Sequence, residues 1–269
     1  MRLYDRSHGF MEPSIPPALF ALLLFIGMLS LLETGRRLGT RRRSIESEAE
    51  RSSLSTVEGA VFALFGLMMA FTFSGAATRF SEKRMLIAEE VNTIETAYLR
   101  LDLLPEEAKL VLQELFRRYV DSRLETYGKL PNLPDAETEI SKSKKLQNEI
   151  WGQAVAATRL PDCHPEAGKL LLPALNNMID IATTRTMALQ SHPPRIVYAL
   201  LFALGLICSM LAGYRMASGQ RRSWLHILSL TVFTVIIVFV TLDVEYPREG
   251  LIRLQNADQL LVNVRESMK

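Results

Sequence analysis

The sequence contains few of the residues that build catalytic and metal centres. It has two cysteines and four histidines, and it lacks HExxH, CxxC, Walker and GxSxG motifs. Cys163 and His164 are neighbours in a proline-flanked stretch, but adjacent residues seldom hold the geometry of a nucleophile and its base. We therefore expect no enzyme, no catalytic residue, no metal site and no cofactor.

An excess of either charge is also absent. The 31 Lys and Arg residues nearly balance the 29 Asp and Glu residues, which leaves a net charge of +2. Binding of nucleic acid needs a basic surface that neutralises phosphates, so this balance argues against a nucleic-acid partner. The two cysteines, Cys163 and Cys208, are far apart, so a disulfide framework is not expected either.

Charge is strongly segregated along the chain. Hydrophobic residues make up 48% of the sequence, and four stretches contain almost no charge. A helix needs about 20 apolar residues to cross a bilayer. We therefore predict four transmembrane helices in two hairpins, at residues 17–33, 58–78, 196–215 and 224–243. The first stretch could instead be a signal peptide, but Glu33 and a run of arginines follow it in place of a cleavage site.

Local signals mark the ends of these spans. Glu33 closes the first span. Ser55 and Glu58 form a capping box, which predicts that the helix of the second span begins there. Trp224 and Tyr246 bracket the fourth span, as aromatic residues at membrane interfaces do.

The segment between the hairpins, residues 78–195, is predicted to be a helical bundle outside the membrane. After the second span, apolar residues recur in steps of four and three, the spacing of one helix face: Ile87, Val91, Ile94, Tyr98 and Leu101. No alternating strand pattern appears, so we predict an all-α membrane protein.

The C-terminal stretch is predicted to contain an amphipathic helix that packs on the bundle or on a neighbouring subunit. Its apolar positions are Leu251, Leu254, Leu261 and Val264. The predicted organisation of the chain is thus an N-terminal hairpin, an extramembrane segment, a second hairpin and a C-terminal helix, at residues 1–77, 78–195, 196–243 and 244–269.

Small and weakly polar residues interrupt the apolar helix near the end of the second span. Phe71, Ser74 and Thr78 are spaced by three and four residues, so they share a helix face. One interpretation is close helix packing, since small residues let helices approach each other in lipid. The other is a pore lining, with hydroxyl groups that contact an ion and a constriction at Phe71.

Charged residues lie where the second and fourth spans end on the same membrane face. Asp243 and Glu245 close the fourth span, and Arg79 and Arg84 follow the second. Charges at a membrane boundary usually find partners, so we predict that these carboxylates pair with these arginines. Arg79 is also placed to attract anions at a pore mouth.

A short motif in this region resembles bestrophin anion channels. Residues 78–84, TRFSEKR, are similar to the bestrophin signature D-R-Y/F-W-E-A-R at Arg79, Phe80, Glu82 and Arg84. Thr78 and Ser81 depart from that signature.

Two longer motifs resemble the bestrophin-like membrane proteins of bacteria. Residues 89–105, EEVNTIETAYLRLDLLP, are similar to the run EAN-x-I-x-TAYLR-x-DLLP of that family. Residues 242–253, LDVEYPREGLIR, are similar to its ending LD-x-x-x-P-x-x-G-L-I-R. Bestrophins are pentamers whose second transmembrane helix lines an anion pore. The resemblance therefore implies a homo-oligomeric channel, a pentamer that conducts anions such as chloride, in a bacterial inner membrane.

Two signals disagree about orientation in the membrane. Arginines crowd loops 34–57 and 216–223, so the positive-inside rule places these loops in the cytoplasm. Bestrophins instead keep their termini and their helical segment in the cytoplasm. The side on which residues 78–195 lie stays open at this point.

Two functions are compatible with these features. The first is an oligomeric ion channel with its pore along the second span. The alternative is a non-catalytic structural or signalling membrane protein that binds a partner through its helical extramembrane segment.

Overall fold

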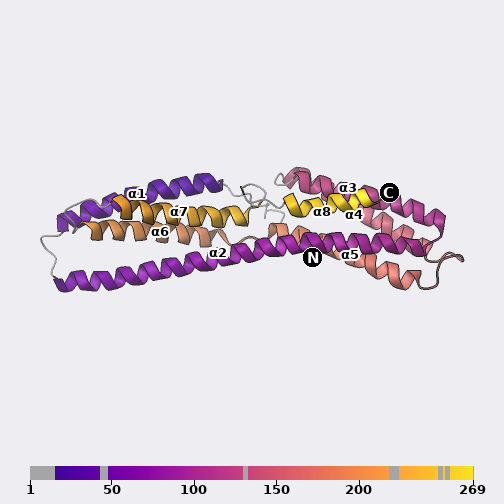
Figure 1. Cartoon of the computed structure of the whole chain (residues 1–269), viewed down its shortest axis with the longest axis horizontal. Helices are drawn as coiled ribbons and strands as arrows, with labels where there is room; N and C mark the ends of the chain where they lie inside the picture. The colour runs from indigo at the N-terminus through magenta and orange to yellow at the C-terminus, as the bar shows by residue number, and fades with distance from the viewer. Residues whose placement is uncertain are drawn as a thin grey trace, which may run out of the picture. The chain divides into compact units, whose positions relative to one another are not determined.

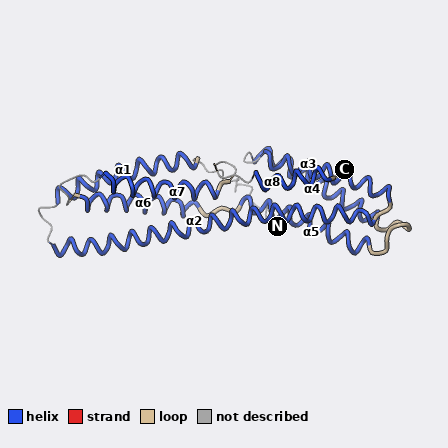
Figure 2. The backbone as a smooth tube through the Cα atoms, viewed as in Figure 1, coloured by secondary structure: helices blue, strands red, loops and turns tan. Residues whose placement is uncertain are grey.

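The computed structural model of the chain is built from helices. The structure describes residues 16–42, 48–129, 133–217, 224–247, 251 and 255–268. Within these residues there is no strand, and loops and turns join the helices (Figure 2). The predicted all-α fold is therefore confirmed.

The helices follow the predicted order. In chain order they are α1 (Pro17–Arg42), α2 (Glu48–Leu99), the 3-10 helix η1 (Arg100–Leu103), α3 (Glu106–Lys129), α4 (Leu133–Ala157), α5 (Ala167–Gln190), α6 (Arg195–Met216), α7 (Trp224–Glu245) and α8 (Gln255–Ser267). Among the described residues, four helices are long and apolar enough to span a membrane, namely α1, α2, α6 and α7. These are the four predicted spans. Most of the predicted loop 216–223 lies outside the described residues.

The first apolar helix is longer than predicted, because α1 continues past Glu33 to Arg42. The Glu33 carboxylate accepts a hydrogen bond from Arg36 Nε at 3.2 Å and another from Arg37 Nε at 3.0 Å. Pairs spaced by three and four residues stabilise a helix surface. The charge at Glu33 is therefore offset within the helix and does not end it.

The predicted start of the second helix is wrong. The helix α2 begins at Glu48, so Ser55 and Glu58 lie inside it and cap nothing. Both side chains instead accept hydrogen bonds from Arg215 Nη1 of α6, at 2.6 Å and 3.2 Å. A capping box and a tertiary contact can use the same residue types, and spacing alone does not separate them.

The described residues form two compact units. The membrane unit comprises the described parts of residues 16–80 and 192–251, and the extramembrane unit comprises those of residues 81–191 and 255–268. The helix α2 contributes residues to both units, and its apolar part belongs to the membrane unit.

In the membrane unit, α1 packs against α6 and α7 (Figure 1). The backbones of α1 and α6 approach each other closely. A Cβ atom on Gly213 would lie 1.9 Å from the carbonyl oxygen of Leu32, and one on Gly35 would lie 2.0 Å from that of Met210. Small residues allow such approach between helices in lipid. Only glycine fits at these two positions without separating the helices.

Side chains from four helices fill the core of the membrane unit. Its buried members are Leu24, Met28, Phe65, Leu201, Cys208, Val238 and Leu242. The helix α2 contributes Phe65, whose ring lies near Gly205 of α6.

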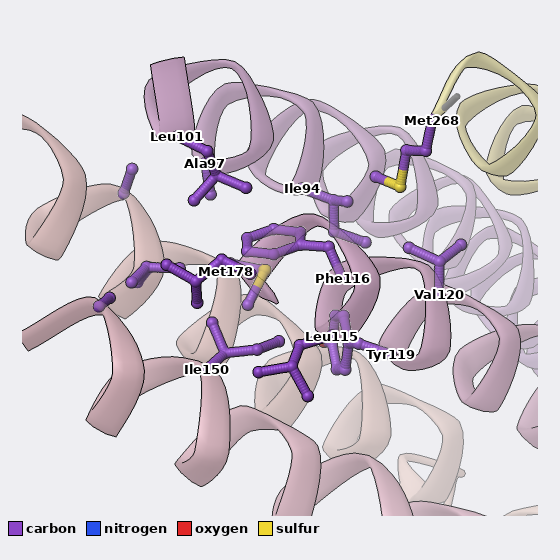
Figure 3. Packing of buried hydrophobic residues seen from close by; sticks show 14 of the residues in the cluster. Ile94, Ala97, Leu101, Leu115, Phe116, Tyr119, Val120, Ile150, Met178 and Met268 are labelled. Carbon is purple, nitrogen blue, oxygen red and sulfur yellow. The ribbon is translucent and has the colours of Figure 1, made fainter. Parts of the chain in front are cut away.

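In the extramembrane unit, α3, α4, α5, α8 and the last part of α2 surround one apolar core. Ile94, Phe116, Ile150 and Met178 meet in this core (Figure 3). The predicted apolar stripe is confirmed, since Ile87, Val91, Ile94 and Leu101 are buried and Tyr98 is partly buried.

The C-terminal helix α8 packs on α3 in the extramembrane unit. Leu261 and Val264 are buried in the shared core, which confirms the predicted packing on the bundle. The predicted helix is too long at its start, because Leu251 lies outside α8 and is exposed. Leu254 lies outside the described residues.

Candidate functional site

The second span is the least buried of the four apolar helices. In its most apolar stretch only 17% of residues are buried, against 44% for α7. The exposed positions recur along α2 at helical spacing, and Leu64, Leu67 and Phe71 are among them. One face of α2 is therefore open in the membrane unit.

The three residues predicted to line a pore lie on this open face. The Phe71 side chain is 69% exposed, and Ser74 and Thr78 are also exposed. Neither hydroxyl group forms a hydrogen bond to any described residue, although other hydroxyls of the spans do. Thr72, Thr231 and Thr241 each donate to the backbone carbonyl four residues earlier.

The contrast between these hydroxyls has an energetic meaning. An unpaired hydroxyl group in hydrocarbon loses its hydration without compensation. The hydroxyls of Thr72, Thr231 and Thr241 avoid that cost through their own helix, whereas those of Ser74 and Thr78 remain open to a partner. The open face of α2 is therefore chemically suited to water, ions or another protein surface.

A partly buried ion pair joins α2, where its membrane-spanning part ends, to the end of α7. Arg79 Nε lies 3.0 Å from both carboxylate oxygens of Glu245, and Arg79 Nη2 lies 2.7 Å from Glu245 Oε2. The Glu245 side chain has no exposed surface. The Arg79 side chain lies beside Gly75, where an added Cβ atom would come within 3.2 Å of Arg79 Nη1.

Arg79 does not share a face with the pore candidates. Successive residues of an α-helix are about 100° apart around the axis, so Arg79 points away from the face of Thr78. Its guanidinium group is held by Glu245 in the membrane unit. The geometry thus separates the hydroxyl face of α2 from the charged cluster where its membrane-spanning part ends.

His192 completes this cluster, although it was not among the predicted site residues. The imidazole Nδ1 lies 3.1 Å from Glu245 Oε1, and the ring stacks on Tyr246 with centroids 4.7 Å apart. A usable signal was present, because His192 precedes the third span on the membrane face where the second and fourth spans end. His192 therefore lies at the same membrane face as Arg79 and Glu245 and could have been grouped with them.

The other two predicted rim residues are not part of this cluster. Asp243 is buried and accepts a hydrogen bond from the backbone N–H of Leu251 at 2.8 Å. Arg84 is exposed and makes no ion pair within the described part of the chain. Of the four predicted residues, the structure therefore pairs Arg79 with Glu245. Asp243 and Arg84 do not take part in that ion pair.

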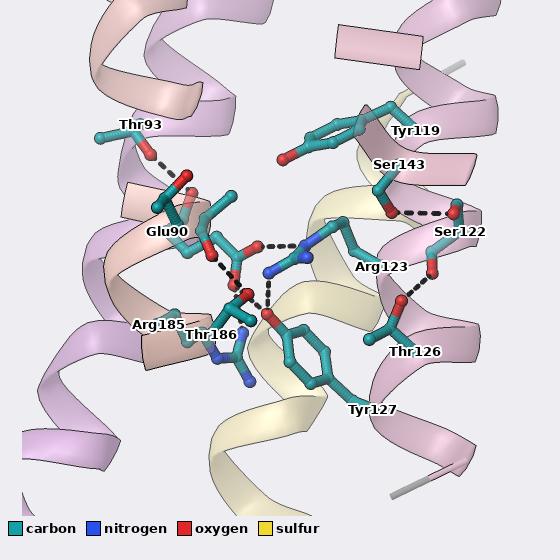
Figure 4. A network of polar contacts seen from close by, with 12 residues as sticks. Glu90, Thr93, Tyr119, Ser122, Arg123, Thr126, Tyr127, Ser143, Arg185 and Thr186 are labelled. Carbon is teal, nitrogen blue, oxygen red and sulfur yellow. Dashed lines mark hydrogen bonds and ion pairs between the residues drawn. The ribbon is translucent and has the colours of Figure 1, made fainter. Parts of the chain in front are cut away.

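The extramembrane unit holds a second buried polar network, shown in Figure 4. Glu90 of α2 accepts a hydrogen bond from Arg123 Nε at 2.6 Å, one from the Tyr127 hydroxyl at 2.9 Å and one from Arg185 Nη1. Arg185 also donates to Asp258 of α8 at 3.1 Å. Glu90 has no exposed surface, and two guanidinium groups balance its charge.

This network was not predicted, because its members are far apart in the sequence. Arg123 and Arg185 are separated by 62 positions and Glu90 lies on a third helix. Charge periodicity within one helix does not show which residue on another helix will face it. The network joins α2, α3, α5 and α8 in one unit.

Cys163 and His164 make separate contacts. The Cys163 thiol donates to the carbonyl oxygen of Leu103 at 3.8 Å, while His164 Nδ1 accepts from the N–H of Glu166 at 3.2 Å. Burial and the nearby Asp162 raise the pKa of Cys163, which disfavours the thiolate. Among the described residues no group of three His, Cys, Asp or Glu side chains is arranged to hold a metal ion.

Four apolar spans and a helical extramembrane unit define a multi-pass α-helical membrane protein. The chain belongs to the Bestrophin-like family, because the Bestrophin-like domain matches residues 34–258. Its fold is similar to the crystal structure of a mutant bacterial bestrophin homologue from Klebsiella pneumoniae, with a TM-score of 0.55 and 15% sequence identity. That similarity covers 94% of this chain and 97% of the homologue. No protein of curated function matches the chain.

Proposed function

We propose that the protein is an oligomeric channel that conducts anions, with its pore along the open face of α2. Membership of the Bestrophin-like family supports a channel-type function. Bestrophins, which the sequence resembles, line an anion pore with their second transmembrane helix. In this chain the second span is also the least buried of the four apolar helices.

The observation that carries the proposal is the pair of open hydroxyl groups on that face. Ser74 and Thr78 are exposed and have no hydrogen-bond partner among the described residues. Hydroxyl groups can replace part of the hydration shell of an ion, and an exposed ring such as Phe71 can narrow a pore and gate it by dewetting. The three residues form one lining because they share a face.

A single helix face cannot enclose a water-filled path, so the proposal requires several copies of the chain. Copies arranged around a central axis would turn the open face of α2 inward and shield it from lipid. Closed rotational symmetry is the usual form of such homo-oligomers. The family resemblance favours five copies.

The ion pair between Arg79 and Glu245 is proposed to set the rim of this pore. It fastens α2 to the end of α7 and so holds the lining face in position. Because the carboxylate offsets the guanidinium charge, attraction of anions to Arg79 is weakened.

Chloride flux through liposomes that contain the purified protein tests the proposal. Phe233 provides a matched control, because this phenylalanine of α7 is 66% exposed, against 69% for Phe71. We expect protein-dependent flux that changes several-fold in Phe71→Ala, as for loss of a steric constriction. Phe233→Ala should leave the flux unchanged.

Equal effects of the two variants on chloride flux would show that α2 does not line the pore. Absence of flux from folded and inserted protein, in wild type and variants alike, would favour the alternative of a partner-binding protein. Exposed Leu99, Leu110 and Val111 of the extramembrane unit are the observation that favours this alternative, since apolar surface outside a membrane suits a protein contact.

The orientation proposed from arginine density places the segments 34–57 and 216–223, the first of which is mostly helical, on the cytoplasmic side of a bacterial inner membrane. A reporter fused to the C-terminus tests it, since the C-terminus would then lie outside the cytoplasm. A cytoplasmic signal would instead support the orientation that bestrophins have.

A further inference from the structure

A cavity of about 160 Å³ opens among α3, α4 and α5 of the extramembrane unit. Basic, hydroxyl and amide side chains line part of it, and Ala182 and two larger apolar side chains line the rest. None of the lining residues is acidic. The cavity is therefore amphipathic and has no carboxylate that would repel an anion.

The floor of the cavity is polar and held in place by buried contacts. Arg123, Ser143 and Gln147 line it, and each is less than one-tenth exposed. Arg123 is fixed by Glu90, the Ser143 hydroxyl lies 2.8 Å from that of Ser122, and Gln147 donates to the Tyr119 hydroxyl at 3.1 Å. Arg123 and Ser143 can be followed in Figure 4. A floor fixed in this way needs little reorganisation when a ligand binds.

Two kinds of hydrogen-bonding group remain available to a ligand. Lys144 lines the cavity and is exposed, and it makes no ion pair within the described ranges. The Gln147 carbonyl oxygen accepts no hydrogen bond from a described residue. The Thr183 and Thr186 hydroxyls donate to carbonyls of their own helix, at 3.3 Å and 2.8 Å, so their oxygens can still accept.

These groups match a particular ligand chemistry. Glu90 and Asp258 together balance the charges of Arg123 and Arg185, so Lys144 supplies the net positive charge of the lining. An ammonium group favours a carboxylate through a charge-assisted hydrogen bond. The open acceptor oxygens favour a hydroxyl or amino group elsewhere on the same molecule, and the apolar wall favours a short carbon skeleton.

We propose that this cavity is a binding site for a small organic carboxylate that also carries a hydrogen-bond donor. Lys144 binds the carboxylate, the acceptor oxygens of the floor bind the donor, and Ala182 lies against the carbon skeleton. The site belongs to the extramembrane unit and does not depend on whether the spans conduct ions.

Binding of lactate to the purified full-length protein, measured by titration calorimetry, tests the proposal. Lactamide is the neutral match, because an amide replaces the carboxylate and the hydroxyl stays. We expect lactate to bind with a Kd on the order of 1 mM and lactamide to bind roughly tenfold more weakly or not at all. Propionate, which lacks the hydroxyl, should also bind more weakly than lactate.

Two neighbouring lysines of α4 give a matched pair of variants. Lys144 lines the cavity, whereas Lys145 is exposed and does not. We expect Lys144→Met to weaken lactate binding by roughly tenfold, while Lys145→Met binds like wild type. Ala182→Leu fills the cavity and should abolish binding, and the lysine pair decides the matter if that variant does not fold.

Three results would each overturn the proposal. They are no lactate binding by folded wild type, equal binding of lactate and lactamide, and an equal loss in the two lysine variants. Each is measured on protein whose folding is checked by its thermal melt.

Discussion

The two units of this chain hold their helices together by different physical means. In the extramembrane unit, buried charges join helices, because Glu90 binds Arg123 and Arg185 at the centre of the bundle. In the membrane unit, α1 and α6 meet through backbone contact at Gly35 and Gly213. Buried ion pairs therefore join the helices of the unit outside the membrane, whereas close contact between backbones joins α1 and α6 in the membrane unit.

The difference follows from the surroundings of each unit. In water, burial of apolar side chains already drives the helices together. Buried charges additionally restrict which helices can lie next to each other, because each charge needs its partner. In lipid an apolar helix face is as well surrounded by lipid tails as by another helix. The hydrophobic effect therefore does not drive the helices together, and their association depends on close packing. The ion pair of Arg79 with Glu245 lies at the end of the spans and not within their apolar core.

The largest expected effect comes from removing the central charge of the extramembrane unit. Glu90→Gln leaves the buried guanidinium group of Arg123 without a carboxylate and Arg185 with Asp258 alone. Breaking a buried ion pair typically costs about 3–5 kcal/mol. Hydrogen exchange of the amides of α3 and α5 should then become faster. The membrane unit has no part in this contact, so exchange in α1 should not change.

The neighbouring residue Glu89 provides the control for this variant. Glu89 is exposed, so Glu89→Gln removes the same charge and should change stability by less than about 0.5 kcal/mol. Similar exchange in the two variants would mean that the buried network does not hold the unit together.

The next largest effect tests backbone contact in the membrane unit. Gly213→Ala places a Cβ atom 1.9 Å from the carbonyl oxygen of Leu32, so α1 and α6 must separate. Overpacking of this kind typically costs about 1–3 kcal/mol. The thermal stability of the protein in detergent should fall, and exchange in α1 should rise while that in α3 stays the same.

Gly66 is the matched control, because an added Cβ atom there would meet nothing within 4 Å. Gly66→Ala should be neutral or slightly stabilising, since alanine favours helix more than glycine does. If Gly213→Ala behaves like Gly66→Ala, the two spans are not held by close approach.

The smallest effect at neutral pH concerns a buried phenol of the extramembrane unit. Burial raises the pKa of Tyr119 from its ordinary value of 10.0 to about 12. The folded state then holds this proton more tightly than the unfolded state, so stability is intact below pH 10 and falls as the pH rises towards 12. The loss in free energy of unfolding reaches about 2–3 kcal/mol near pH 12.

Alkaline unfolding of Tyr119→Phe checks this assignment. The variant should lose stability less steeply with rising pH, although it also loses the hydrogen bond from Gln147. Burial also raises the pKa of Tyr127. The variant should therefore keep part of the sensitivity to alkaline pH. An unchanged slope would show that Tyr119 does not contribute.

The apolar pattern was sufficient to predict the helices and the spans. Charge-free stretches of membrane length located α1, α2, α6 and α7, and the stripe from Ile87 to Leu101 identified the buried face of α2. These features repeat within one helix, so their periodicity is visible in the sequence. The family motifs at residues 89–105 and 242–253 led to the same family as the domain match.

Contacts between distant helices were harder to predict. Ser55 and Glu58 looked like a cap because they are close in sequence, whereas Arg215, their partner, is 160 positions from Ser55. The Glu90 network was missed for the same reason, whereas the position of His192 before the third span was a signal that could have placed it near Glu245. A single sequence shows which residues share a helix face but not which face of another helix they meet.

The pairing of Arg79 with Glu245 has a consequence for the electric field at the end of the second span. A lone guanidinium group produces a potential that falls with distance, whereas the paired groups form a dipole whose potential falls with the square of the distance. Salt screens exposed charges beyond about 8 Å at physiological ionic strength. Arg79 therefore hardly steers an ion in bulk solution. The field of the pair acts only on an ion that is already close to it.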